Sequence, residues 1–109
     1  SSGNLTSPYY PGYYITDISY TWHIHAPPGH VIRIYFTDFA LEEHVTCSKD
    51  NVVVYDGADV TSLLLGRYCG YVYPQLIQSA SNDVTIVFSS DENFVHRGFS
   101  LHYLFIERK

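Results

Sequence analysis

The sequence predicts an all-β domain in which two antiparallel sheets pack as a β-sandwich. Short stretches of alternating apolar and polar residues recur about every ten residues, separated by turn-forming Gly, Pro and Asp. No stretch repeats its apolar residues with the period of an amphipathic helix. Tyrosine and phenylalanine, which number 11 and 6, favour strands over helices. A chain of 109 residues is long enough for one domain with one core.

The first quarter of the chain predicts an irregular segment followed by a strand. Residues 7–14 contain two prolines, which block a helix and favour extended geometry in the residues before them. Residues 20–25 alternate, so Tyr20, Trp22 and Ile24 are expected to share one face, and Thr21, His23 and His25 the other. The Pro-Pro-Gly sequence that follows ends this strand.

The next strand and the loop after it differ sharply in polarity. Residues 31–36 alternate, which places Ile32, Ile34 and Phe36 on an inward face and Arg33 outside. The acidic segment 42–50 then predicts a loop.

A central strand and three further strands complete the predicted sandwich. Residues 51–55 carry valine on both faces, as expected for a strand covered on both sides, and Asp56-Gly57 predicts the turn after it. Residues 63–68 form a short apolar strand. Residues 84–88 and 99–105 alternate again.

Charge and hydropathy exclude two classes of partner. The net charge is −5, from 11 acidic and 6 basic residues, whereas nucleic-acid binding needs a basic face. An acidic surface is instead suited to cations and to basic protein partners. No apolar run approaches the roughly 20 residues of a membrane-spanning helix, so we expect no membrane insertion by this segment.

The two cysteines, Cys47 and Cys69, allow one intrachain disulfide or two buried free thiols. Asn4 begins an Asn-Leu-Thr glycosylation sequon, which is used in the secretory pathway and therefore favours the disulfide. On the chain-entropy argument, closing the loop between the cysteines would stabilise the fold by roughly 3 kcal/mol. The bond needs an oxidising compartment, so we expect an extracellular location, with Asn4 as a candidate glycosylation site.

An ordered set of motifs runs over nearly the whole chain. The motifs are Ser7-Pro8-x-Tyr10-Pro11, Tyr14, Trp22-x-Ile24, Pro28-Gly29, Phe36-Thr37-Asp38-Phe39-x-Leu41-Glu42, Cys47-x-x-Asp50, Asp56-Gly57, Gly66-Arg67-Tyr68-Cys69-Gly70, Phe88-x-Ser90-Asp91 and Gly98-Phe99-x-x-x-Tyr103. Taken in this order, they resemble the CUB domain. The resemblance implies a single CUB domain over residues 1–109, with jelly-roll-like sandwich topology. It also implies an extracellular binding module of multidomain proteins.

The chain departs from many CUB domains by having one bridge in place of two. Tyr20 stands close to the position where another cysteine usually falls, so only the pair equivalent to Cys47–Cys69 remains. Packing and strand pairing alone would then hold the N-terminal strand, which we expect to be the least secure edge of the fold.

The resemblance also implies a calcium site. In the calcium-binding CUB domains the ligands fall at positions that match Glu42, Asp50 and Asp91, with Tyr14 in support and Asn93 as a further oxygen donor. Three clustered carboxylates repel one another, and a hard divalent cation that takes 6–8 oxygen ligands relieves this repulsion. Calcium suits the set better than zinc because the set offers no thiol or histidine cluster.

Two alternatives weaken this interpretation of the acidic residues. Any one of these acidic residues, taken alone, is more simply explained as a solvated loop charge. Glu43 also competes with Glu42 for the first ligand position; we choose Glu42 because it directly follows the Phe39-x-Leu41 motif.

The resemblance predicts a non-enzymatic module whose calcium-ordered acidic loops hold a basic residue of a protein ligand. One alternative is calcium-independent binding through a sheet face or edge. Another is a structural or dimerisation module beside a protease or receptor domain, with a homodimer formed through neighbouring modules. The tyrosines could form a sugar-binding platform, but strand and core positions explain them more simply.

Catalysis is not indicated by the remaining polar residues. The six histidines form no helical His-x-x-x-His pair and no recognised zinc pattern. No Gly-x-Ser-x-Gly motif marks a nucleophile. His23 and His25 alternate on one strand face, and we interpret the histidines as surface residues with some scope for pH-sensitive binding.

Overall fold

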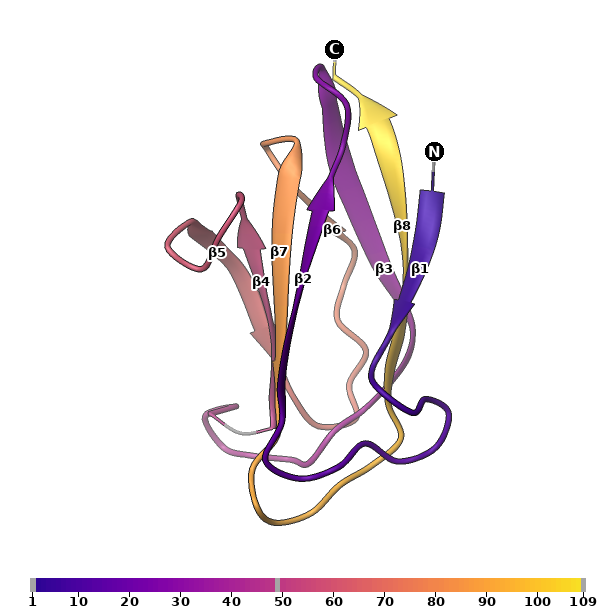
Figure 1. The fold of residues 1–109 in the computed structure, drawn as a ribbon, viewed down its shortest axis with the longest axis vertical. Coiled ribbons are helices and arrows are strands. Elements are labelled where there is room, and N and C mark those ends of the chain that lie inside the picture. The colour runs from indigo at the N-terminus through magenta and orange to yellow at the C-terminus, as the bar shows by residue number, and fades with distance from the viewer. Residues whose placement is uncertain (1, 49, 109) are drawn as a thin grey trace.

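Two antiparallel sheets face each other in the computed structural model, which describes residues 2–48 and 50–108 (Figure 1). One sheet has the strand order β1-β8-β3-β6 and the other has the order β2-β7-β4-β5. The predicted all-β sandwich is therefore confirmed. No helix in the described residues is long and apolar enough to cross a membrane. The strands are β1 (Ser2–Thr6), β2 (Ser19–His25), β3 (His30–Ala40), β4 (Asn51–Asp56), β5 (Leu63–Tyr68), β6 (Ile77–Gln78), β7 (Asp83–Ser89) and β8 (Gly98–Glu107).

Strand β3 is longer than the alternation of residues 31–36 predicts. Ile32, Ile34 and Phe36 are buried as expected. The pairing of β3 with β8 then shifts between Phe36 and Asp38, where a β-bulge inserts one extra residue. Because the bulge resets the alternation, Phe36 and Phe39 both face the core, and the strand continues to Ala40.

Strand β4 occupies the central position that its valines predict. It lies between β7 and β5, and Val52, Val53 and Val54 are all buried. Strand β5 lies at the edge, and its first two leucines are largely exposed.

Strand β2 forms the other edge of the same sheet. Ile24 is buried, and the half-buried Trp22 ring packs edge-on against Phe99 with ring centroids 5.8 Å apart. Tyr20, on the same face of the strand, is 48% exposed. It lies at the end of an edge strand, where the opposite sheet does not cover it.

Strands β1 and β6 could not be identified from local sequence patterns. β1 contains a single large apolar residue, Leu5, yet it pairs with β8 over its full length, from Ser2 opposite Leu104 to Thr6 opposite Ser100. β6 is only two residues long and pairs with β3. Both strands depend on partners that are distant in the sequence, so a local pattern does not reveal them.

Aromatic rings fill the core close to one end of the sandwich. Tyr14 packs edge-on against Phe88, Phe88 against Phe99, and Phe99 against Phe36, with centroid distances of 4.9, 5.6 and 5.9 Å. Edge-to-face contacts of this kind add to the stabilisation from burial alone.

The loops that follow β1, β3, β5 and β7 gather at this same end, which is the lower end in Figure 1. The disulfide Cys47–Cys69 joins the loop after β3 to the segment after β5, with the Cα atoms 5.3 Å apart. The predicted cysteine pairing is confirmed. At the opposite end of the sandwich, β1 begins and β8 ends (Figure 1).

We expect Phe99→Ala to lower the free energy of unfolding by about 3–5 kcal/mol, because it removes a fully buried ring from the aromatic cluster. Phe94→Ala is the matched control, since the Phe94 side chain is 72% exposed and should change stability by no more than about 0.5 kcal/mol. Urea unfolding followed by tryptophan fluorescence measures both. Equal losses in the two variants would contradict the placement of the core.

Candidate metal centre

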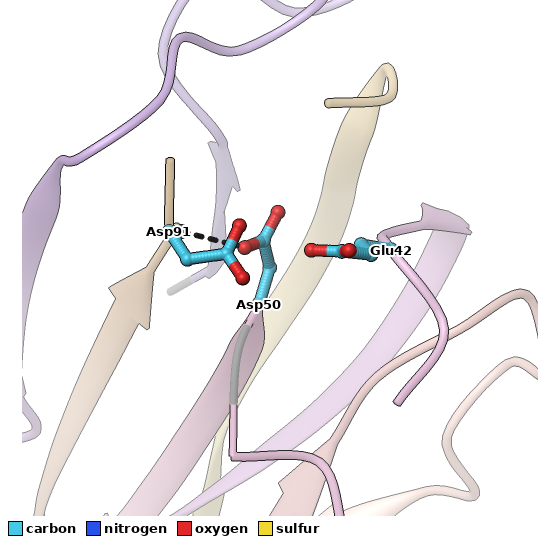
Figure 2. A group of neighbouring side chains, drawn as sticks. All are labelled: Glu42, Asp50 and Asp91. Carbon is cyan, nitrogen blue, oxygen red and sulfur yellow. Dashed lines mark hydrogen bonds between the residues drawn. The ribbon is translucent and has the colours of Figure 1, made fainter. Parts of the chain in front are cut away.

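Three carboxylate side chains, two from the loop between β3 and β4 and one from the loop after β7, meet at the loop end of the sandwich (Figure 2). Glu42 follows β3, Asp50 precedes β4 and Asp91 follows β7. One oxygen from each lies within 4.8 Å of the other two. The fold therefore brings together the three acidic residues that the resemblance singles out.

Asp50 lies at the centre of this acidic cluster and is fully buried. The Tyr14 hydroxyl donates a hydrogen bond to Asp50 Oδ2 at 2.5 Å, and the Asp91 backbone N–H donates to Asp50 Oδ1 at 2.7 Å. Burial raises the pKa of Asp50, although these two hydrogen bonds oppose the shift. The carboxylate is thus held in one orientation at a cost in desolvation.

Tyr14 occupies the supporting position expected of it. Its ring is buried against Phe88, and its hydroxyl both donates to Asp50 and accepts a hydrogen bond from the Glu42 backbone N–H at 3.3 Å. Burial and the neighbouring Asp50 raise the pKa of Tyr14 far above its usual value, so the hydroxyl stays protonated. One side chain therefore connects the loop after β1 to two of the three acidic residues.

Glu42 carries the clearest sign of an unmet interaction in the cluster. Its Oε1 atom is buried and, within the described ranges, has no hydrogen-bond partner. Burial and the neighbouring Asp91 raise the pKa of Glu42. Burial acts in the same direction on Asp91, but hydrogen bonds that include the Asn93 N–H outweigh it and lower that pKa. A buried acceptor without a donor is costly, and a cation would satisfy it.

The structure separates Glu42 from its competitor Glu43. Glu43 is exposed, and its side chain lies against Gly70. A Cβ atom added to Gly70 would be 3.3 Å from Glu43 Cγ. Asn93 is exposed as well, and its backbone N–H donates to Asp91 Oδ1 at 3.0 Å. The geometry thus groups Glu42 with the other two acids, whereas the recorded contact of Asn93 with the cluster is through its main chain.

Ser90 is a supporting residue that sequence reasoning did not single out. Its hydroxyl donates to the Ile15 carbonyl at 2.7 Å and accepts from the Ile18 N–H at 3.2 Å. The Asp17 N–H also donates to the Asp91 carbonyl at 3.0 Å. These bonds hold the segment after Tyr14 against the loop that carries Asp91.

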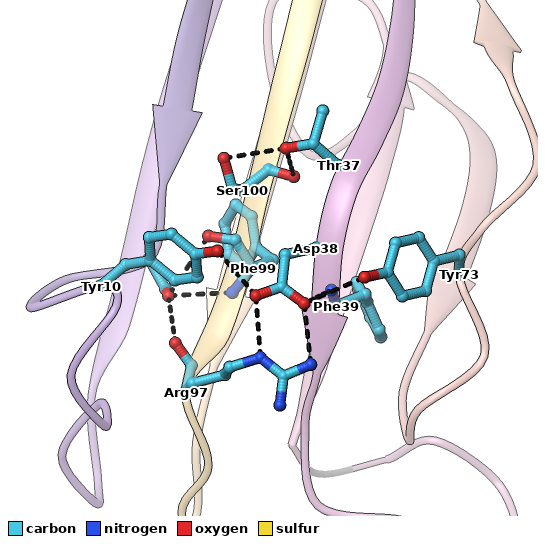
Figure 3. A network of polar contacts seen from close by, with 9 residues as sticks. Tyr10, Thr37, Asp38, Phe39, Tyr73, Arg97, Phe99 and Ser100 are labelled. Carbon is cyan, nitrogen blue, oxygen red and sulfur yellow. Dashed lines mark hydrogen bonds and ion pairs between the residues drawn. The ribbon is translucent and has the colours of Figure 1, made fainter.

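Asp38 forms a second polar centre that sequence reasoning missed (Figure 3). Its carboxylate accepts hydrogen bonds from the Tyr10 and Tyr73 hydroxyls at 2.6 and 3.1 Å. It also accepts two from the Arg97 guanidinium, both at 2.8 Å. The Arg97 contacts hold the pKa of Asp38 well below its usual range, against the effect of partial burial. The available signal was that Asp38 is the one acidic residue in strand β3.

The Asp38 centre ties three loops to strand β3. Tyr10 lies in the loop that also contains Tyr14, Arg97 lies in the loop that contains Asp91, and Tyr73 follows the disulfide-linked segment. This centre therefore restrains the loop that carries Asp91 and the loop that carries Tyr14.

Asn4, the candidate glycosylation site, is exposed on the edge strand β1. Its side-chain oxygen lies 2.7 Å from Nδ1 of His102 on β8. Glycosylation of Asn4 remains a prediction.

The family model described as CUB domain matches residues 1–103. The zinc metalloproteinase nas-39 of Caenorhabditis elegans is 41% identical over 102 residues, which cover 94% of this chain and 11% of nas-39. Cubilin of Rattus norvegicus is 40% identical over 103 residues, which cover 94% of this chain and 3% of cubilin. The chain thus spans about a tenth or less of the length of these two curated relatives.

Solved structures agree with the sequence relatives. The CUB1-EGF-CUB2 region of human MASP-1/3 superposes with a TM-score of 0.89 and 30% identity, covering 97% of this chain and 42% of that one. A MASP-1 CUB2 domain bound to Ca²⁺ superposes with a TM-score of 0.82 and 30% identity, covering 94% of this chain and 90% of that one.

We expect Asp38→Asn to lower the free energy of unfolding at pH 7 by about 2 kcal/mol, because it removes the charge that Arg97 contacts. The pKa of Asp38 is lower in the folded state than the ordinary value of about 3.9 expected for the unfolded chain. Its contribution is therefore complete above about pH 4 and is lost as the pH falls towards the folded-state value.

Urea unfolding at pH 7 and near pH 2.5 measures this difference, with Glu107→Gln as the control at an exposed acidic position. The gap between wild type and Asp38→Asn should narrow at the lower pH. A gap that is independent of pH would refute the assigned role of the Asp38 charge.

Proposed function

The chain belongs to the CUB domain family, and we propose that it binds a protein partner through acidic loops that calcium orders. CUB domains are non-catalytic protein-interaction modules of extracellular proteins. The extracellular location of the relatives applies to this chain, and the Cys47–Cys69 disulfide fits it. In this proposal, residues 1–109 act as a single CUB domain.

The observation that carries the calcium proposal is the buried, partnerless oxygen of Glu42 beside two further carboxylates. Glu42, Asp50 and Asp91 would hold the ion, and Asn93 would add an oxygen from its side chain or main chain. Calcium accepts oxygen ligands from flexible loops and tolerates irregular geometry, which suits a site assembled from the loops after β3 and β7. The calcium-bound MASP-1 CUB2 domain supports the same assignment by analogy.

The role of the ion would be to neutralise and order these loops. Without a cation, burial disfavours the ionised forms of Glu42 and Asp50 and raises the pKa of both carboxyl groups. A bound divalent cation would favour the ionised forms and draw the loops after β3 and β7 together. The ordered loop end would then present the remaining acidic oxygens to a partner.

The partner favoured by this surface offers a lysine or arginine. The chain carries a net charge of −5, and exposed Glu43 and Glu92 lie next in sequence to the ligands Glu42 and Asp91. A charge-assisted hydrogen bond could hold a basic side chain, but an exposed ion pair contributes only about 0–1 kcal/mol. Strong binding would therefore need several modules that act together.

Calcium-independent binding at a sheet edge is the second candidate. A hollow of about 440 Å³ lies beside the edge strand β2, and the half-buried Trp22 and half-exposed Tyr20 contribute to its wall. Their rings lie 6.0 Å apart. Such an aromatic edge could contact a partner without any ion. A structural or dimerisation role would be recognised by self-association in sedimentation.

We expect millimolar calcium to raise the melting temperature of chelator-stripped protein and to give saturable binding in calorimetry. An affinity in the range of about 10⁻⁴ to 10⁻³ M is typical of extracellular modules. Glu42→Gln and Asp91→Asn should weaken binding, whereas Glu43→Gln should leave it unchanged, because Glu43 points towards Gly70.

The neighbouring pair Glu42 and Glu43 makes this test specific, since both variants remove one charge from the same loop. Equal losses in the two would indicate a general charge effect. Absence of calcium binding by the wild-type protein would refute the proposal and direct attention to the aromatic edge of β2.

A further inference from the structure

Two histidines and one aspartate converge on the exposed outer face of the second sheet. His23 Nε2 lies 2.7 Å and His25 Nδ1 lies 2.8 Å from the same atom, Asp83 Oδ1. The side chains are 46%, 63% and 21% exposed for His23, His25 and Asp83. All three donor groups are therefore accessible from solvent.

The strand register explains this convergence. His23 and His25 are two residues apart on β2, so their side chains project from the same face of the sheet. β2 pairs with β7 so that His25 lies directly opposite Asp83, and His23 lies opposite Thr85. The sequence pattern places the two histidines on one face, but only the pairing with β7 adds the carboxylate.

We propose that His23, His25 and Asp83 form a binding site for a divalent transition-metal ion of the zinc type. Neutral imidazole nitrogens and a carboxylate are preferred ligands of such ions, whereas calcium prefers oxygen alone. Three protein ligands leave coordination positions that water can fill from the solvent side.

A metal ion can replace the hydrogen bonds that now join His23 and His25 to Asp83. In the neutral histidines, the nitrogens that face Asp83 carry the protons that they donate to its carboxylate. On binding, each proton moves to the other ring nitrogen, and the freed lone pair faces the ion. Exposed side chains rotate rapidly, so both nitrogens and the carboxylate can reach the roughly 2.0–2.2 Å that zinc requires.

The other histidines of the chain lack this arrangement. Among the described residues, the ion pairs that include a histidine are those with Asp83. The remaining histidines have other polar neighbours: the Pro28 carbonyl for His30, Thr46 and Ser48 for His44, Tyr71 for His96, and Asn4 for His102.

This site is independent of the acidic cluster. It lies where β2 ends and β7 begins, at the end of the sandwich opposite the loops that carry Glu42, Asp50 and Asp91 (Figure 1). An ion bound here would join the edge strand β2 to its neighbour β7. It would therefore reinforce an edge without contact with the proposed calcium ligands.

Calorimetric titration of ZnCl₂ into calcium-saturated, tag-free protein at pH 7.4 tests the proposal. We expect one saturable zinc site in the wild-type protein, and at least about a tenfold loss of affinity in His23→Gln, His25→Gln and Asp83→Asn. His102→Gln is the matched control and should bind as the wild type does.

Cobalt(II) supplies a second readout, because its visible absorption reports coordination by nitrogen ligands and should disappear in the double variant His23→Gln/His25→Gln. Two results would overturn the proposal: no zinc binding by the folded wild-type protein, or zinc binding that survives in the double variant. Because calcium is present throughout, failure of this site would leave the calcium proposal unaffected.

Discussion

The buried hydrogen bond from Tyr14 to Asp50 is the interaction around which the loop end is built. A desolvated carboxylate is unfavourable unless donors surround it, and Asp50 receives donors from the loop after β1 and the loop after β7. The same tyrosine ring closes the aromatic core against Phe88. Core packing and the position of the acidic cluster thus depend on one side chain, so the site cannot move without disturbing the core.

The loop end also divides its polar residues into two functions. The Asp38 carboxylate is fully hydrogen-bonded by Tyr10, Tyr73 and Arg97, so its charge serves to hold loops in place. Glu42 retains an unsatisfied oxygen in the neighbouring cluster. The disulfide adds a covalent restraint on the loop between β3 and β4. Protein contacts alone therefore restrain part of the loop end, while the buried Glu42 oxygen still lacks a hydrogen-bond partner.

Much of the fold could be predicted from alternation alone, because burial on one face of a strand leaves a period of two in the sequence. The inward side chains of Ile32 and Ile34 follow from this rule, whereas the central position of β4 follows from the valines on both of its faces. The rule fails where a bulge resets the period beyond Phe36, and where Tyr20 sits on an edge that the opposite sheet does not cover. It is also uninformative for β1, whose partner lies about a hundred residues away.

The candidate site could be predicted less well than the fold from local sequence patterns. Residue spacing alone does not bring positions 42, 50 and 91 together, and the family resemblance supplied that grouping. Asp38 and Asp83 acquire their roles from partners that are far away in the sequence, namely Arg97 for the first and the two histidines of β2 for the second. A local pattern cannot encode such contacts, because they depend on strand register and loop placement.

The placement of β1 has a mechanical consequence. Because β1 and β8 are antiparallel, the start of β1 lies beside the end of β8 at one end of the sandwich. A pulling force applied between these two strand ends would load their hydrogen bonds one after another, as in a zipper, and not all at once, as in shear. No covalent bridge reaches β1, since the disulfide joins Cys47 to Cys69. Under tension β1 would therefore peel away first, while the acidic loops at the far end kept their shape.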